Sequence, residues 1–163
     1  MGKKAKSKNA TPRVFLVVID DSDELHQALY YACRRAANLD GHVALMHCIP
    51  PAEFQHWAGV GELMRDEARA EAENLLRVNS EYVHELTGKT PMVYLREGDP
   101  KTELINVINE ASDITMLILG ASTDGENTGP LINYITTKGA SVCRVPITIV
   151  PGNLSDDDID NIT

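Results

Sequence analysis

Five short apolar runs, separated by longer segments of helical periodicity, constrain the fold of this chain most strongly. The runs are Val14 to Ile19, Val43 to Ile49, Met92 to Leu95, Ile114 to Leu119 and Ile147 to Val150. Continuous runs of this length, rich in β-branched residues, are typical of strands buried on both faces of a parallel sheet. The segments between them repeat apolar residues at steps of three or four, which predicts amphipathic helices.

Local signals set the expected ends of these helices. Asp21 stands three residues before Glu24, a capping-box spacing, and Asp40-Gly41 ends the first helix. A loop over 52–61, with Phe54 and Trp57, precedes a long helix that closes at Thr87-Gly88. Asp99 is placed to cap a third helix, with Pro100 in its first turn, and a fourth runs from Pro130 to Cys143.

The alternation of strands and helices predicts an α/β fold: a single doubly wound domain with a five-stranded, mostly parallel sheet and helices on both faces. We expect the strand order 3-2-1-4-5. In that order the loop after Ile19 and the loop after Leu119 face each other across a crevice, at the carboxyl ends of the strands. Asp20 and Ser22 are therefore expected to lie close to the segment Gly120 to Gly129.

Charge and composition divide the chain into three parts. We expect a flexible basic tail over 1–12, a domain over 13–151 and an acidic tail over 152–163. The net charge of -9 argues against nucleic acid as a partner, and the longest apolar runs are too short to cross a membrane. The sequence is typical of a cytoplasmic protein, in which Cys33, Cys48 and Cys143 are reduced, buried thiols.

The fourth apolar run leads into a glycine-rich loop and then to a helix start, the arrangement that places phosphates in α/β folds. Its glycines are Gly120, Gly125 and Gly129. The same loop contains Asp124 and Glu126 and no Lys or Arg, so its charge opposes a bound anion.

Several motifs together resemble the universal stress protein family over Arg13 to Pro151. The matching segments are Val18-Ile19-Asp20-Asp21-Ser22, Leu45-Met46-His47-Cys48, Gly98-Asp99-Pro100, Asp113 through Gly120, and Val145-Pro146-Ile147-Thr148-Ile149-Val150. The resemblance implies a stress-response binding or signalling protein with an adenine-nucleotide pocket. By the same resemblance Asp20 would contact the sugar or the base, and the main chain at Cys48 would meet the adenine edge. Alternatively, Asp20 is a buried structural or helix-capping acid.

The ATP-binding members of that family carry G-x2-G-x9-G followed by Ser or Thr. Gly120 matches the first glycine, but Thr123, Asn133 and Tyr134 stand at the later motif positions. We therefore expect a degenerate pocket in which ATP binds weakly or not at all. The alternative is a functional ATP- or AMP-binding site in which Gly125 and Gly129 form a variant loop; these glycines otherwise only turn the chain.

Other classes of protein fit the sequence less well. A phosphorylation-controlled receiver domain would explain Asp20-Asp21, but it needs an acceptor Asp after the third strand, and Asp99 belongs to a helix start. No catalytic triad, nucleophile motif or metal-ligand spacing is present, so we expect no enzyme and no metal site. His47 is expected to be a hydrogen-bonded core residue.

The last strand is expected to lie at an edge of the sheet. Its four β-branched residues, Ile147, Thr148, Ile149 and Val150, predict a homodimer formed by edge-to-edge pairing. The resembled family commonly dimerises there as well. A further protein partner is expected, although the sequence does not identify it.

Overall fold

The computed structural model describes residues 11–51, 60–125 and 128–163. The expected features at Phe54, Trp57 and Glu126 lie outside these residues.

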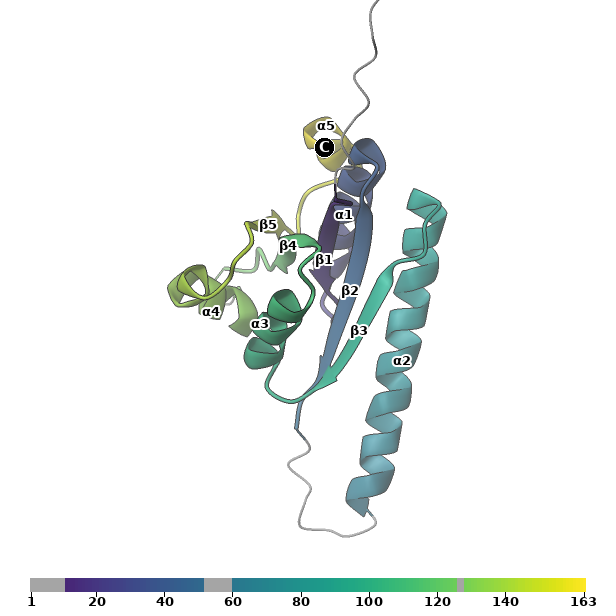
Figure 1. Ribbon diagram of the computed structural model, residues 1–163, viewed down its shortest axis with the longest axis vertical. Helices are drawn as coiled ribbons and strands as arrows, with labels where there is room; N and C mark the ends of the chain where they lie inside the picture. The colour runs from purple at the N-terminus through teal and green to yellow at the C-terminus, as the bar shows by residue number, and fades with distance from the viewer. Residues whose placement is uncertain (1–10, 52–59, 126–127) are drawn as a thin grey trace, which may run out of the picture.

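A five-stranded parallel sheet forms the centre of the protein (Figure 1). Its strands are β1 (Val14–Val18), β2 (His42–Ile49), β3 (Met92–Glu97), β4 (Ile114–Ala121) and β5 (Ile147–Pro151). The order β3-β2-β1-β4-β5 is the predicted one, and every neighbouring pair is parallel. Because β1 lies in the middle, its residues are the most completely buried, with Leu16 and Val17 at 0% exposure.

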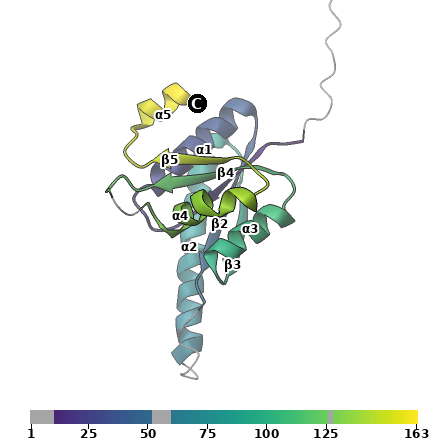
Figure 2. The ribbon, with the colours of Figure 1, turned by 90° about the vertical axis from the view of Figure 1, so that its left-hand side faces the viewer.

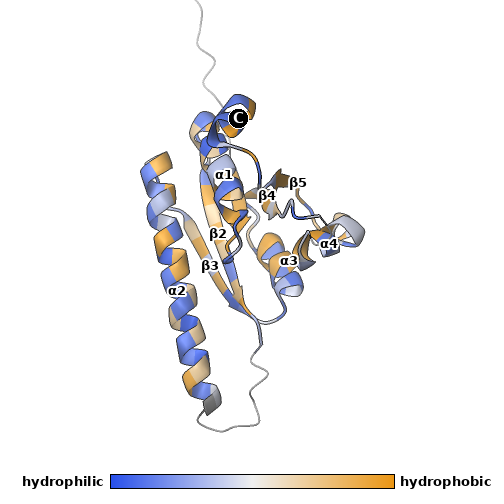
Figure 3. Ribbon diagram, turned by 180° about the vertical axis from the view of Figure 1, so that it is seen from behind, coloured by the Kyte–Doolittle hydropathy of each residue, from blue (hydrophilic) through white to orange (hydrophobic). Residues whose placement is uncertain are grey.

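Two hydrophobic clusters, one on each face of the sheet, attach the helices. Helices α1 (Leu25–Leu39) and α2 (Val60–Thr87) pack on one face, and α3 (Pro100–Glu110) and α4 (Pro130–Thr137) pack on the other (Figure 1). Figure 3 shows bands of hydrophilic and hydrophobic residues along α2, as expected for an amphipathic helix. No helix in the described part of the chain is both long and apolar enough to cross a bilayer.

Two helix boundaries differ from the sequence prediction. Helix α1 begins at Leu25, and its N-cap residue Glu24 makes no capping hydrogen bond, so the predicted capping box is wrong. Helix α4 ends at Thr137 rather than near Cys143, and a short 3-10 turn (Gly139–Ser141) follows. A Cβ atom at Gly139 would lie 2.6 Å from Cδ1 of Ile135 and 3.3 Å from its Cβ atom, so a side chain here would require Ile135 to move.

The predicted cap of α3 is confirmed. A carboxylate oxygen of Asp99 accepts hydrogen bonds from the Thr102 backbone at 3.0 Å and from the Thr102 hydroxyl at 2.9 Å. These hydrogen bonds lower the pKa of Asp99. The cap fixes the turn between β3 and α3.

The acidic C-terminal segment contains a helix, α5 (Asp156–Ile162), which packs on α1 (Figure 2). Ser155 and Asp158 form a reciprocal capping box at its start, and Ile159 is completely buried. Oδ1 of Asp160 lies 2.7 Å from Nε of Arg34 on α1, which makes an ion pair. The segment predicted as an acidic tail therefore includes a folded element, because one buried isoleucine and these polar contacts attach it to the domain.

Candidate ligand-binding crevice

The crevice predicted from the strand order lies at the carboxyl ends of β1 and β4, and two adjoining hollows form it. The first, called here the β1–β4 cleft, has a volume of about 220 Å³. It is lined by Val18, Asp20, Ser22, Glu24, Leu25, Leu119, Gly120, Thr128, Gly129, Pro130, Leu131 and Ile132. Asp20, Gly120 and Gly129 are thus brought together as the sequence predicted.

The second hollow lies between the end of β2 and the side of α2 and is called here the β2–α2 hollow. Its volume is about 550 Å³. Its lining residues are Asp20, Asp21, His47, Cys48, Ile49, Pro50, Ala68, Glu71, Ala72, Asn74 and Leu75. Asp20 lines both hollows, so one carboxylate stands where they meet.

Asp20 is exposed and organises the loop after β1. Its Oδ1 accepts hydrogen bonds from the Ser22 backbone at 3.0 Å and from the Ser22 hydroxyl at 2.5 Å. Asp20 is therefore neither the buried acid nor the helix cap considered from the sequence. Because both hydrogen bonds end on Oδ1, the turn holds the carboxylate in a fixed direction at the crevice.

The end of β2 supplies His47 and Cys48. His47 Nδ1 lies 2.6 Å from the carbonyl oxygen of Ile19, which confirms the expected hydrogen bond and ties β2 to the loop after β1. The expected core position is wrong, because His47 is half-buried and lines the β2–α2 hollow. The thiol of Cys48 donates to the Gly98 carbonyl at 3.4 Å, and burial raises its pKa to about 11. The thiol is therefore protonated at neutral pH and is a poor nucleophile.

All three cysteines are free, but only Cys33 is fully buried. Burial raises the pKa of Cys33 to about 12. Cys48 and Cys143 are half-buried, which corrects the expectation of three buried thiols.

Gly120, the residue that matched the first glycine of the phosphate motif, has a structural role in this protein. A Cβ atom at this position would lie 2.6 Å from the carbonyl oxygen of Glu24 and 3.0 Å from its carbonyl carbon. Gly152 also lies close to this residue, because a Cβ atom at Gly152 would lie 2.7 Å from Glu24 Cβ. The missing side chain at Gly120 therefore lets the start of α1 pack against the end of β4.

Gly125 and Gly129 adopt backbone conformations that favour glycine. Their φ angles are +86° and +94°, and a Cβ atom at either position would meet nothing within 4 Å. Both positions need glycine for its backbone conformation at a turn, and neither needs it to make room for a neighbouring atom. Thr123 and Asp124, earlier in the loop, are exposed and line neither hollow of the crevice.

Asn133 and Tyr134 belong to α4 but do not line the β1–β4 cleft. Asn133 anchors the glycine loop, because its Oδ1 accepts a hydrogen bond from Thr128 at 2.9 Å and its backbone N–H donates to Gly129 at 3.1 Å. Tyr134 faces Lys101 of α3 and lines a separate hollow, not the β1–β4 cleft. The structure thus does not place the tyrosine where it would fill the phosphate end of the crevice.

The crevice is strongly acidic. Asp20 and Glu24 line the β1–β4 cleft, and Asp20, Asp21 and Glu71 line the β2–α2 hollow. Among the residues that the structure describes, no Lys or Arg lines either hollow. Within the described residues, no three His, Cys, Asp or Glu side chains are arranged to hold a metal ion. A phosphate in this crevice would therefore meet carboxylates without a neighbouring cationic side chain.

The chain belongs to the universal stress protein family, whose sequence model matches residues 12–151. A universal stress protein from Mycolicibacterium smegmatis is 26% identical over 151 residues, which are 90% of this chain and 50% of that protein. The chain therefore spans about half the length of this curated relative.

Solved structures share the fold. Universal stress protein UspA from Lactobacillus plantarum superposes with a TM-score of 0.72 at 18% identity, covering 87% of this chain and 99% of that chain. The universal stress protein from Archaeoglobus fulgidus in complex with dAMP has a TM-score of 0.64 at 17% identity, covering 86% of this chain and 99% of that chain.

Proposed function

We propose that this protein is a stress-response binding and signalling module that takes an adenosine-type ligand in the crevice and binds ATP weakly or not at all. The observation that carries the proposal is the position of Asp20, which lines both hollows at the point where the strand order reverses. Open parallel sheets bind their ligands at this point. The protein acts by binding rather than by catalysis, in the cytoplasm and through an unidentified protein partner.

The β2–α2 hollow suits a nucleobase. Its volume of about 550 Å³ lies within the range of small-molecule pockets, roughly 300–1,000 Å³. Ile49, Ala72 and Leu75 supply apolar surface, and the Cys48 backbone supplies polar groups for the edge of a base. Asp20, at the junction, is placed to accept hydrogen bonds from sugar hydroxyls.

The phosphate side of the crevice opposes a triphosphate. Two unit charges about 4 Å apart interact by roughly 4 kcal/mol at an effective dielectric constant near 20, before salt screening. Asp20 and Glu24 face this space, and Asp124 stands in the exposed loop beside it. Each added phosphate is therefore expected to weaken binding.

An ATP- or AMP-binding site with a variant loop is the second candidate. Gly129 lines the cleft directly before the first turn of α4, where backbone N–H groups favour an anion. The dAMP complex of the Archaeoglobus fulgidus relative is consistent with a single phosphate in such a fold.

A receiver domain is a weaker alternative still, because receivers use the strand order 2-1-3-4-5 and this sheet does not.

Asp20→Asn is expected to weaken adenosine binding about tenfold, since one hydrogen bond to a charged acceptor is worth roughly 1.5–3 kcal/mol. The amide oxygen of this variant can still accept the two hydrogen bonds from Ser22, so the turn is retained. Isothermal titration calorimetry with adenosine measures the change. Asp23→Asn is the matched control, because Asp23 is exposed on the same loop and lines neither hollow.

Equal affinities of the parent and the Asp20→Asn variant would remove the central residue from the proposed site. Loss of binding in the Asp23→Asn control would show instead that loop charge in general, and not Asp20, controls the crevice.

A further inference from the structure

A third hollow lies between α3 and α4, outside the crevice, and has the opposite charge. It is called here the α3–α4 hollow, has a volume of about 430 Å³ and is lined by Lys101, Pro130, Asn133, Tyr134, Thr137 and Lys138. Only Pro130 is shared with the lining of the β1–β4 cleft. The two sites are therefore neighbours on opposite sides of the α4 N-terminus.

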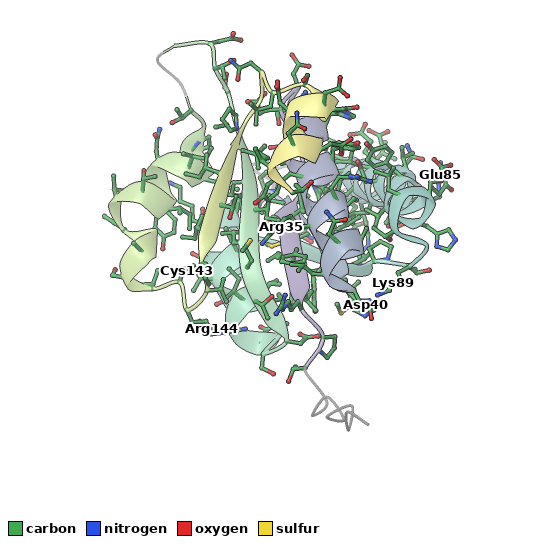
Figure 4. The ribbon with its side chains drawn as sticks, turned by 90° about the horizontal axis from the view of Figure 1, so that it is seen from above. Arg35, Asp40, Glu85, Lys89, Cys143 and Arg144 are labelled. Atoms are coloured by element: carbon green, nitrogen blue, oxygen red, sulfur yellow. The ribbon has the colours of Figure 1, made fainter. Side chains whose placement is uncertain are left out.

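The lysines of this hollow stand out in an acidic protein of net charge -9. The described residues include three lysines. One of them, Lys89, forms an ion pair in which its Nζ lies 2.7 Å from Oδ1 of Asp40 (both residues are labelled in Figure 4). Lys101 and Lys138 are the other two, and neither makes an ion pair within the described residues. Both line the α3–α4 hollow.

Asp99, one of the two acidic residues nearest to Lys101 in the sequence, forms no ion pair with it. Asp99 is directed into the first turn of α3, where its carboxylate accepts the two hydrogen bonds from Thr102. Lys101 Nζ instead lies 6.0 Å from the centre of the Tyr134 ring. The cation and the aromatic ring therefore come together across two helices.

The remaining lining residues are Pro130, which is apolar, and the polar residues Asn133 and Thr137, whose side chains make hydrogen bonds to the loop and within α4. Asn133 Oδ1 is engaged by Thr128, which leaves the amide Nδ2 of Asn133 as its hydrogen-bond donor. The Thr137 hydroxyl donates a hydrogen bond to the backbone carbonyl of Asn133 at 2.7 Å. This bond fixes the Thr137 hydroxyl against α4. Two ammonium groups, an amide donor and a ring face thus surround one hollow.

We propose that the α3–α4 hollow is a second binding site, for a small organic anion in which a phosphate group is attached to a planar ring. Lys101 and Lys138 neutralise the phosphate, and the ring packs against Tyr134. The hollow has the volume of a small-molecule site, and its charge complements an anion that the acidic crevice repels. This inference is independent of the ligand proposed for the crevice.

Phenyl phosphate is the probe, because it has the phosphate and the ring but no nucleoside. Titration into ¹⁵N-labelled protein at low salt is expected to shift backbone amides around Lys101 and from Asn133 to Lys138. Phenol and inorganic phosphate are titrated in parallel, and each is expected to bind at least about fivefold more weakly than phenyl phosphate, because each lacks one of the two contacts.

The double variant Lys101→Gln, Lys138→Gln is expected to bind phenyl phosphate about tenfold more weakly than the parent, since it loses both charged hydrogen-bond donors. Lys89→Gln is the matched control and should bind like the parent, because Lys89 pairs with Asp40 away from this hollow.

The proposal is overturned if the double variant binds phenyl phosphate as tightly as the parent, or if the shifted amides lie at the crevice. Equal affinity for phenol or for inorganic phosphate also overturns it, because the ring and the phosphate would not act together. Adenosine binding does not enter this test, so a failure here and a failure of the proposed function are separate results.

Discussion

Gly120→Ala is expected to lower the free energy of unfolding by about 2–3 kcal/mol, within the range measured for overpacked cores. The added Cβ would lie 2.6 Å from the carbonyl oxygen of Glu24 and 3.0 Å from its carbonyl carbon, and these backbone atoms cannot rotate away. Either the end of β4 or the start of α1 must move. Urea denaturation followed by circular dichroism measures the loss.

Gly125→Ala, in the loop that follows β4, is the comparison. Its Cβ would meet nothing within 4 Å, and the cost comes only from a φ of +86°, about 1 kcal/mol. If Gly120→Ala is as stable as the parent but loses ligand affinity, Gly120 serves ligand approach as the family motif implies, and the packing explanation is wrong.

We propose that the protein forms a homodimer through the free edge of β5, and Ile149→Pro is then expected to be a monomer. The Leu117 backbone donates to Pro146 and the Gly152 backbone donates to Ala121, both at 2.9 Å, so residues 146, 148, 150 and 152 face β4. Alternation along the strand then turns the N–H groups of Ile147 and Ile149 toward the free edge. Ile149 also has an exposed side chain, at 39%. Proline removes the edge donor without breaking the ladder to β4.

Light scattering after gel filtration measures this change at tens of micromolar protein. The parent should have about twice the chain mass of 17.9 kDa, as a dimer does. The Ile149→Pro variant should have the mass of a single chain. Ile149→Thr retains both the N–H and the branched side chain and should remain dimeric. A monomeric parent, or a dimeric Ile149→Pro variant, would contradict pairing through β5.

Much of the fold could be predicted from the sequence because each strand contains a short run of mostly apolar residues. The end of α1 at Asp40 and the cap of α3 at Asp99 also rest on local residues, since Asp40 has a φ of +51° and Asp99 bonds Thr102. Helix α5 was missed because four aspartates dominate its composition. The signals for it were the Ser155-x-x-Asp158 spacing and Ile159, whose burial depends on a surface of α1 that the sequence does not display.

The position of the candidate crevice could be predicted from the strand order, but the contacts of its lining residues could not. Sequence reasoning brought Asp20, Gly120 and Gly129 together, and the structure has all three in one cleft. It could not show that Gly120 makes room for Glu24, because that contact joins residues almost a hundred positions apart. Nor could it show that Tyr134 faces α3, which depends on the angle at which α4 lies on the sheet.

The lysines of the α3–α4 hollow are a second case in which tertiary structure was needed. Lys101 and Lys138 are separated along the chain and belong to no motif of the sequence. Their common position arises only because α3 and α4 pack on the same face of the sheet.

Calorimetric titration of the parent protein with adenosine and with Mg-ATP tests the central claim most directly. The acidic lining of the crevice predicts that adenosine binds at least about tenfold more tightly than Mg-ATP, since a single unfavourable charge contact of 1.4 kcal/mol gives that ratio. A dissociation constant for Mg-ATP of about 10 µM or lower, about -7 kcal/mol, together with weaker binding of adenosine, would contradict the account.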